Sequence, residues 1–112
     1  MLGTIKSSTE ISYLFSHGKR HATPVLTMIV YKRDTQHGPS GRVAFIAGKK
    51  NGNAVWRNSA KRRMRAVCHD IGGSWPDLDV LFIANRKTTR AGYNELLSAC
   101  RKVIDSYQTK AQ

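Results

Sequence analysis

Two kinds of hydrophobic pattern meet in one short segment, RVAFIAGKKNGNAVWRNSAKRRMR, residues 42–65. Its beginning, Arg42–Ala47, is rich in residues that favour β-strands, and glycines follow at positions 48 and 52. After Asn53, a residue type that caps helix N-termini, the period changes to steps of three and four, as expected of a helix with one buried side. The apolar positions of this predicted helix are Trp56, Ala60, Met64, Val67 and Ile71. We therefore predict a strand, then a helix that ends at Gly72-Gly73.

Positive charge is concentrated in the same segment. No acidic residue occurs between Asp34 and Asp70, whereas this window contains Lys49, Lys50, Arg57, Lys61, Arg62, Arg63 and Arg65. At about 100° per residue, one arc of the helix, opposite the apolar one, holds Arg57, Asn58, Lys61, Arg62 and Arg65. A short charged stretch is usually a solvated surface, but like charges four residues apart repel each other by a few tenths of a kcal/mol per pair. A bound polyanion explains such an arc better than solubility does.

The composition of the whole chain agrees with a polyanionic partner. The 112 residues suffice for one domain, and 19 Lys and Arg against 7 Asp and Glu give a formal net charge of +12. The longest apolar runs, Val25–Tyr31 and Val80–Ala84, are too short to span a bilayer. Because the N-terminus also lacks the apolar stretch of a secretory signal, we expect a cytoplasmic protein without a membrane partner.

The remaining elements are predicted outward from the central segment. Ser7 and Glu10 form a capping-box pattern, so a first helix is expected at Ser8–His17, ending at Gly18. A strand is predicted at residues 25–31, after Pro24, and a short strand is predicted before this proline. A hairpin with its turn at residues 34–41 is expected to join the strand at 25–31 to the strand at 42–47. A further strand is predicted at Leu78–Ala84. The buried stripe of a final helix consists of Tyr93, Leu96, Leu97, Cys100, Ile104 and Tyr107. The order is αβββαβα in one domain, residues 1–112, with a core at about 7–107 and a frayed C-terminal tail.

The sequence does not predict a catalytic or metal site. Cys68 and Cys100 are expected to be free thiols, because a lone pair in a chain without a signal sequence is usually reduced. There is no CxxC motif, and the seven acidic residues are scattered. Asp77 and Asp79 are interpreted as exposed acidic residues at the beginning of a strand. The lysines at 49 and 50 do not form a P-loop, since Val43 stands where its first glycine would be.

The run from Arg42 to Arg65 resembles the signature of the bacterial ribonuclease P protein. In that family a strand ending in Lys-Lys leads through Gly-x-Ala-Val into Arg-Asn-Arg, then a Lys-Arg pair and a further Arg, and these groups occur in the same order here. The likeness extends to Leu14, Phe15 and Gly18 in the first helix, and to Asp79–Arg86 followed by Tyr93. It covers nearly the whole chain.

The resemblance implies an α+β fold, a small α/β sandwich, with an unusual left-handed βαβ crossover that carries the basic helix. It also implies an RNA-binding subunit of an endoribonuclease that removes the 5′ leader from precursor tRNA. We therefore expect the catalytic RNA to perform the chemistry and to hold Mg²⁺, and the protein itself to bind no cofactor and to supply no catalytic residue.

By the same resemblance, the basic helix and the preceding lysines contact the catalytic RNA, and a cleft beside the first helix takes the leader. The expected RNA-binding residues are Lys49, Lys50, Arg57, Asn58, Lys61, Arg62, Arg63 and Arg65, and the expected cleft residues are Phe15, Tyr31 and Arg42. Phe15 and Tyr31 are equally compatible with a place in the core. The chain departs from the family pattern at Ser59, where an arginine is usual, at Gly48, where a serine is usual, and at Ile11, where an aromatic is common.

Two other classes share the charge pattern. A ribosomal or RNA-assembly protein would coat folded RNA, and a DNA-binding module would place the basic helix in a major groove. Neither class predicts a leader cleft.

Overall fold

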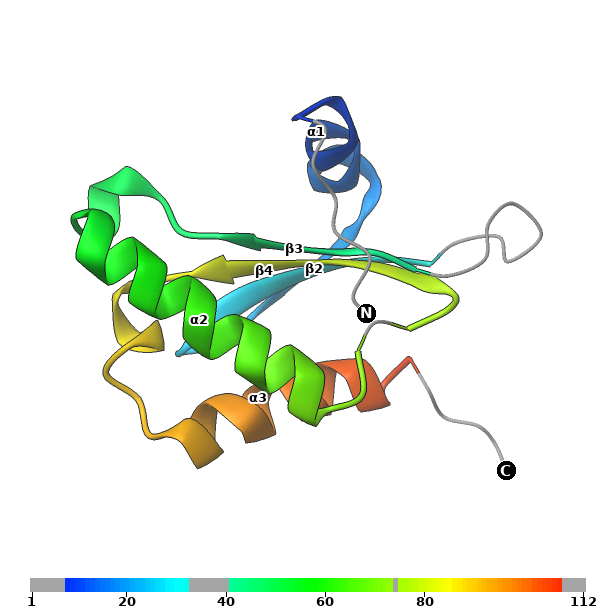
Figure 1. Ribbon diagram of the computed structural model, residues 1–112. Helices are drawn as coiled ribbons and strands as arrows, with labels where there is room; N and C mark the ends of the chain where they lie inside the picture. The colour runs from blue at the N-terminus through cyan, green and yellow to red at the C-terminus, as the bar shows by residue number, and fades with distance from the viewer. Residues whose placement is uncertain (1–7, 33–40, 74, 108–112) are drawn as a thin grey trace.

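The computed structural model describes residues 8–32, 41–73 and 75–107, which form one four-stranded sheet with helices on both faces (Figure 1). Within these ranges the elements follow the predicted order αβββαβα, with the short 3-10 helices η2 and η3 in the connections. Their bounds are α1 Ser8–His17, β1 Lys19–Ala22, β2 Leu26–Lys32, β3 Val43–Ile46, η2 Lys49–Asn51, α2 Ala54–Asp70, β4 Leu78–Ala84, η3 Arg86–Thr88 and α3 Tyr93–Asp105. No helix in these three ranges is long and apolar enough to cross a membrane.

The strand order β1-β2-β4-β3 corrects the predicted hairpin between the strands at 25–31 and 42–47. The last strand, β4, lies between β2 and β3, antiparallel to β2 and parallel to β3. The hairpin that does form joins β1 to β2, with Ala22 opposite Thr27, and the hydroxyl of Thr23 supports its turn by donating to the carbonyl of Leu26 over 2.7 Å. Local patterns identified the strands, but pairing depends on a segment much later in the chain.

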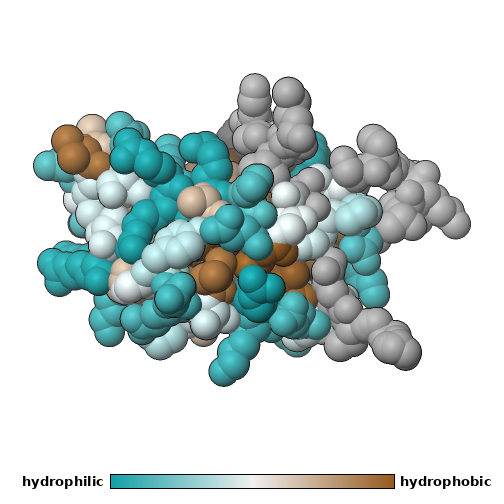
Figure 2. All heavy atoms as spheres, turned by 60° about the horizontal axis from the view of Figure 1, so that its bottom comes forward, coloured by the Kyte–Doolittle hydropathy of each residue, from teal (hydrophilic) through white to brown (hydrophobic). Residues whose placement is uncertain are grey.

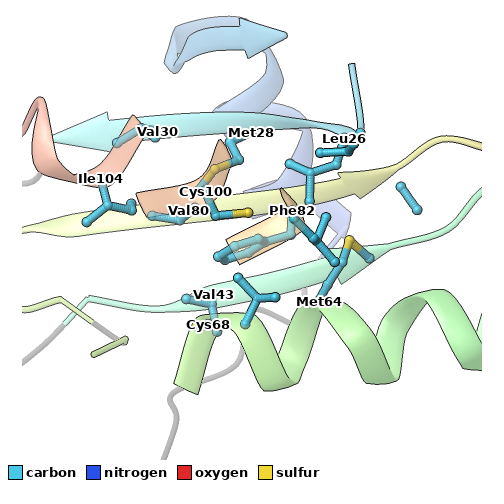
Figure 3. Packing of buried hydrophobic residues seen from close by; sticks show 14 of the residues in the cluster. Leu26, Met28, Val30, Val43, Met64, Cys68, Val80, Phe82, Cys100 and Ile104 are labelled. Carbon is cyan, nitrogen blue, oxygen red and sulfur yellow. The ribbon is translucent and has the colours of Figure 1, made fainter. Parts of the chain in front are cut away.

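The β3–α2–β4 connection is a left-handed crossover, as the resemblance implied. In Figure 3, seen from the side of α2 with α1 behind the sheet, β3 and β4 both point to the right and β4 lies above β3. A right-handed connection, the usual one for parallel strands, would place β4 below β3 from this side. The strand order places β3 at one edge of the sheet, and α2 runs across the face that also carries α3 (Figure 1).

The main core lies between the sheet and the helix pair α2 and α3 (Figure 3). From α2 it takes Ala60, Met64 and Val67, which are fully buried as predicted, while Trp56 and Ile71 pack at its margin. The side chain of Asn53 caps α2 by accepting from the backbone N–H of Trp56 over 3.0 Å. The predicted stripe of α3 also faces this core, with its centre, Leu96, Cys100 and Ile104, buried.

On the opposite face, α1 covers a smaller apolar cluster. Leu14 of α1 packs with Ile29, Ala44 and Leu81 of three neighbouring strands. The helix has the predicted bounds and ends at Gly18, where a Cβ would come within 2.7 Å of the Leu14 carbonyl oxygen. Three predictions fall outside the described residues: the Ser7 part of the capping box, most of the turn at 34–41, and the tail after residue 107.

Candidate nucleic-acid interface

The outer side of α2 carries the predicted basic arc. Asn58, Arg62 and Arg65 are exposed, and Arg57 and Lys61 are half-exposed on the flank. The fully buried residues of α2 lie on its opposite side, so the positive charges cannot turn inward without breaking the core. Figure 2, which shows the α2 and α3 side, has hydrophilic side chains over most of this face around a small apolar area.

Arg65 ties the basic arc to the edge strand. Its guanidinium lies over the ring of Phe45 in β3, 5.1 Å from the ring centroid, and Phe45 in turn stacks on Phe82 of β4. A cation held over an aromatic face keeps its charge while losing conformational freedom. The arc therefore continues from α2 toward the open edge of the sheet at β3.

A basic hollow of about 350 Å³ lies where η2 meets η3. Among the residues that the structure describes, its lining combines four cations with polar and aromatic groups and contains no carboxylate: Lys49, Lys50, Asn51, Gly52, Trp56, Arg86, Thr89 and Arg90. We call this feature the η2–η3 hollow. Sequence analysis placed Lys49 and Lys50 at the RNA interface but missed Arg86 and Arg90, because no periodic pattern links the two segments. The one available signal was the Asn-Arg-Lys sequence that follows β4.

Arg63, predicted to bind RNA, lies on the other flank of α2 and points toward η3. Its Nη1 donates to the carbonyl oxygens of Thr88 and Ala91, over 2.8 and 2.7 Å. Close by on this side, Tyr93 donates to Asp70 over 2.5 Å. Arg63 thus serves contacts within the protein through this nitrogen, and its contact with RNA stays a prediction.

The predicted cleft beside α1 contains a hollow of about 150 Å³ that brings Tyr31 and Arg42 together. Tyr13, which sequence analysis missed, is 46% exposed there and forms an edge-on ring pair with Tyr31, with centroids 5.5 Å apart. The two tyrosine hydroxyls are 3.2 Å apart, and this hydrogen bond raises the pKa of Tyr31. Phe15 is equally exposed, on α1, but does not line this hollow.

Arg42 in this hollow is held between two carboxylates. Its guanidinium lies 2.7 Å from Glu10 and 3.9 Å from Asp79, and its backbone N–H donates to Asp79 over 3.0 Å. Asp79 is only 5% exposed, which corrects the interpretation of this residue as part of an exposed strand end. Its carboxylate fixes the start of β3 to β4. Because Arg42 is paired, the hollow offers aromatic rings rather than free positive charge.

No group of three histidine, cysteine or acidic side chains able to hold a metal ion occurs within residues 8–32, 41–73 and 75–107. Cys68 and Cys100 are free, as predicted. Both lie buried between the helices and the sheet, and burial raises the pKa of each thiol to about 12.

Comparison with known proteins supports the resemblance seen in the sequence. The family model described as ribonuclease P matches residues 3–108. The chain belongs to the ribonuclease P protein family. It is 31% identical over 93 residues to the ribonuclease P protein component of Oceanobacillus iheyensis, covering 82% of this chain and 75% of that protein. It is 32% identical over 100 residues to that of a Streptococcus pyogenes strain, covering 89% and 82%.

Solved structures of ribonuclease P proteins share the fold. The protein of Staphylococcus aureus superposes with a TM-score of 0.78 at 18% sequence identity, covering 96% of this chain and 97% of that one. The protein of Thermotoga maritima gives 0.75 at 15% identity, covering 95% and 98%. The likeness therefore spans both faces of the sheet and the crossover.

The structure shows the surroundings of two positions at which this chain departs from the family pattern. Ile11 is half-buried and packs against the cluster under α1. Ser59 is partly exposed one helical turn before Arg63, on the same side of α2. Position 59 therefore faces the flank of α2 nearer to η3 rather than the centre of the basic arc.

Proposed function

We propose that this chain is the protein subunit of a ribonuclease P ribonucleoprotein and assists a catalytic RNA in removing the 5′ leader from precursor tRNA. The observation that carries the proposal is one cationic surface formed by the outer arc of α2 and the η2–η3 hollow, whose described lining residues include no carboxylate. Phosphate contacts supply most of the affinity of proteins for nucleic acids, and arginine can grip phosphate in a bidentate manner.

The catalytic RNA is the proposed partner of this surface. Lys49 and Lys50 approach the RNA from the hollow, and Arg57, Lys61 and Arg65 approach it from the arc, so contacts extend along one side of the molecule. The protein contributes positive charge and shape, while the RNA holds Mg²⁺ and carries out the cleavage.

The proposed site of the leader is the cleft beside α1. Tyr13 and Tyr31 offer exposed ring surface there, and Phe15 offers more on the same helix. Stacking of a base on an aromatic side chain contributes about 1–3 kcal/mol. A leader held in this way favours precursor over mature tRNA, since mature tRNA has lost the bound segment.

The test is reconstitution with a transcribed bacterial ribonuclease P RNA. We expect the protein to accelerate single-turnover cleavage of precursor tRNA at low Mg²⁺ and to tighten precursor binding more than mature tRNA binding. Cleavage by the RNA alone should persist at high Mg²⁺ and salt, because ions replace the screening that the protein supplies. If cleavage requires the protein under every ionic condition, and Asp77→Asn abolishes it without weakening binding, the proposal is wrong.

Binding at matched salt separates this proposal from other nucleic-acid functions. We expect tighter binding to the ribonuclease P RNA than to a ribosomal RNA fragment or to duplex DNA of equal length. Preference for the ribosomal fragment would indicate an RNA-assembly protein, and preference for duplex DNA would indicate a DNA-binding module.

A further inference from the structure

The basic side chains of the η2–η3 hollow come from two segments that are far apart in the chain. Lys49 and Lys50 precede α2, whereas Arg86 is the first residue of η3 and Arg90 follows η3 by two residues. A single 3-10 turn has little stability of its own. Contacts with the rest of the protein must therefore fix where Arg86 and Arg90 lie.

Two residues of α2 hold this turn from the side of the helix. Nη1 of Arg63 donates to the carbonyl oxygens of Thr88 and Ala91, the two residues that bracket positions 89 and 90. Nε1 of Trp56 donates to the hydroxyl of Thr89 over 2.9 Å, so α2 also contacts a side chain between those two carbonyls.

The far side of the turn is fixed to the sheet. The buried hydroxyl of Thr88 donates to the carbonyl of Val25, and Asn85 caps the turn by accepting from the backbone N–H of Lys87 over 2.8 Å. Hydrogen bonds on both sides therefore hold the backbone segment that carries Arg86 and Arg90.

We infer that Arg63 and Trp56 are positioning residues that preorganise the η2–η3 hollow for RNA phosphates, and that Arg63 does not contact the RNA. The inference rests on the proposed function, because it assumes that the hollow binds RNA. A site whose cations are already in place loses less conformational entropy on binding than one assembled by the ligand. Arg63 then acts on RNA affinity only through the arginines that it positions.

A double-mutant cycle tests this dependence. The affinity of a transcribed ribonuclease P RNA is measured by filter binding for Arg63→Met in two backgrounds, the wild type and the Arg86→Ala/Arg90→Ala variant. Arg62→Met, the neighbouring residue on the exposed arc, is the matched control for loss of one positive charge. Folding of each variant is checked by near-ultraviolet circular dichroism.

We expect Arg63→Met to weaken binding about fivefold in the wild type and to have an effect within about twofold when Arg86 and Arg90 are already absent, as coupled residues do. Arg62→Met should weaken binding by the same factor in both backgrounds. Should Arg63→Met not fold, Thr89→Val takes its place: it removes the acceptor of Trp56 at similar volume and should show the same coupling.

Three results would overturn the inference. Equal losses from Arg63→Met in both backgrounds would show that Arg63 contacts the RNA itself, and no loss in the wild type would show that the turn needs no such support. Either result leaves the proposed function intact. If the Arg86→Ala/Arg90→Ala variant binds as tightly as the wild type, the hollow is not part of the RNA interface, and this component of the proposed function fails as well.

Discussion

Replacing Arg57 and Lys61 with alanine should flatten the salt dependence of RNA binding. Both side chains lie on the flank of α2 that continues toward β3, four residues apart and without an acidic neighbour. Each phosphate contact contributes about 0.9 to the slope of log K against log salt for a duplex, so two lost contacts lower the slope by about 1.8. Between about 50 and 200 mM salt, the affinity of the wild type should then fall roughly tenfold more than that of the variant.

The assay is a salt titration of binding to a transcribed ribonuclease P RNA. The matched control is Arg101→Ala/Lys102→Ala, which removes two exposed charges from α3 and lowers the net charge of +12 equally. We expect the control to keep the slope of the wild type. Equal slopes for the α2 variant and the wild type, or equal flattening by both variants, would refute the assignment of the interface to the basic arc.

Three further predictions concern stability and reactivity. Met64 is fully buried, so Met64→Ala should lower the free energy of unfolding by about 2–5 kcal/mol in urea titrations, and an unchanged midpoint would contradict the packing of α2. Burial and a neighbouring lysine lower the pKa of His21 from 6.5, and its Nε2 lies 2.6 Å from the Tyr107 hydroxyl. The unfolded chain therefore takes up the proton first as the pH falls below 6.5, so stability should decrease there, and thermal melts of His21→Gln should lack this part of the decrease. Cys68 and Cys100, with pKa values raised to about 12, should react with a disulfide reagent at pH 8 only on unfolding, and rapid labelling of the native protein would contradict their burial.

The local part of the fold was predictable from the sequence. The bounds of α1 and the division of α2 into apolar and basic arcs follow from periodicity, because a helix presents residues three and four apart on one side. Both helix ends follow from local backbone requirements. Asn53 begins α2 because its side chain accepts a hydrogen bond from the first turn, and Gly18 ends α1 because the backbone there passes too close to Leu14 for a Cβ.

Strand pairing was not predictable in the same way. The sequence between residues 25 and 47 is compatible with a hairpin, and only the insertion of β4 between β2 and β3 excludes it. The hydrophobic pattern of Leu78–Ala84 does not indicate which strands pair with it, because a strand buried on both faces has a continuous apolar sequence. The handedness of the crossover came from the family resemblance, since the general rule favours the opposite hand.

The candidate site was predictable where charge follows helical period and not where it depends on tertiary contacts. Arg57, Lys61 and Arg65 lie on the expected arc, whereas Arg63 shares their chemistry but meets the carbonyls beyond η3. The ion pairs of Arg42 likewise depend on α1 and β4, neither of which is adjacent to it in sequence. The number of Lys and Arg residues in the sequence therefore exceeds the number of positively charged side chains available to RNA.

The place of β4 in the sheet determines when the nascent chain can fold. During synthesis β1 and β2 can pair at once, but β3 finds its neighbour only after residues 78–84 have been made. Until then α2 has no completed sheet to pack on, so its apolar arc remains exposed to solvent next to its positively charged side chains. A chain halted before β4 would thus combine sticky apolar surface with strong positive charge, which favours aggregation with nucleic acid. The last third of the protein is therefore needed for the first two thirds to fold into a binding surface rather than to aggregate.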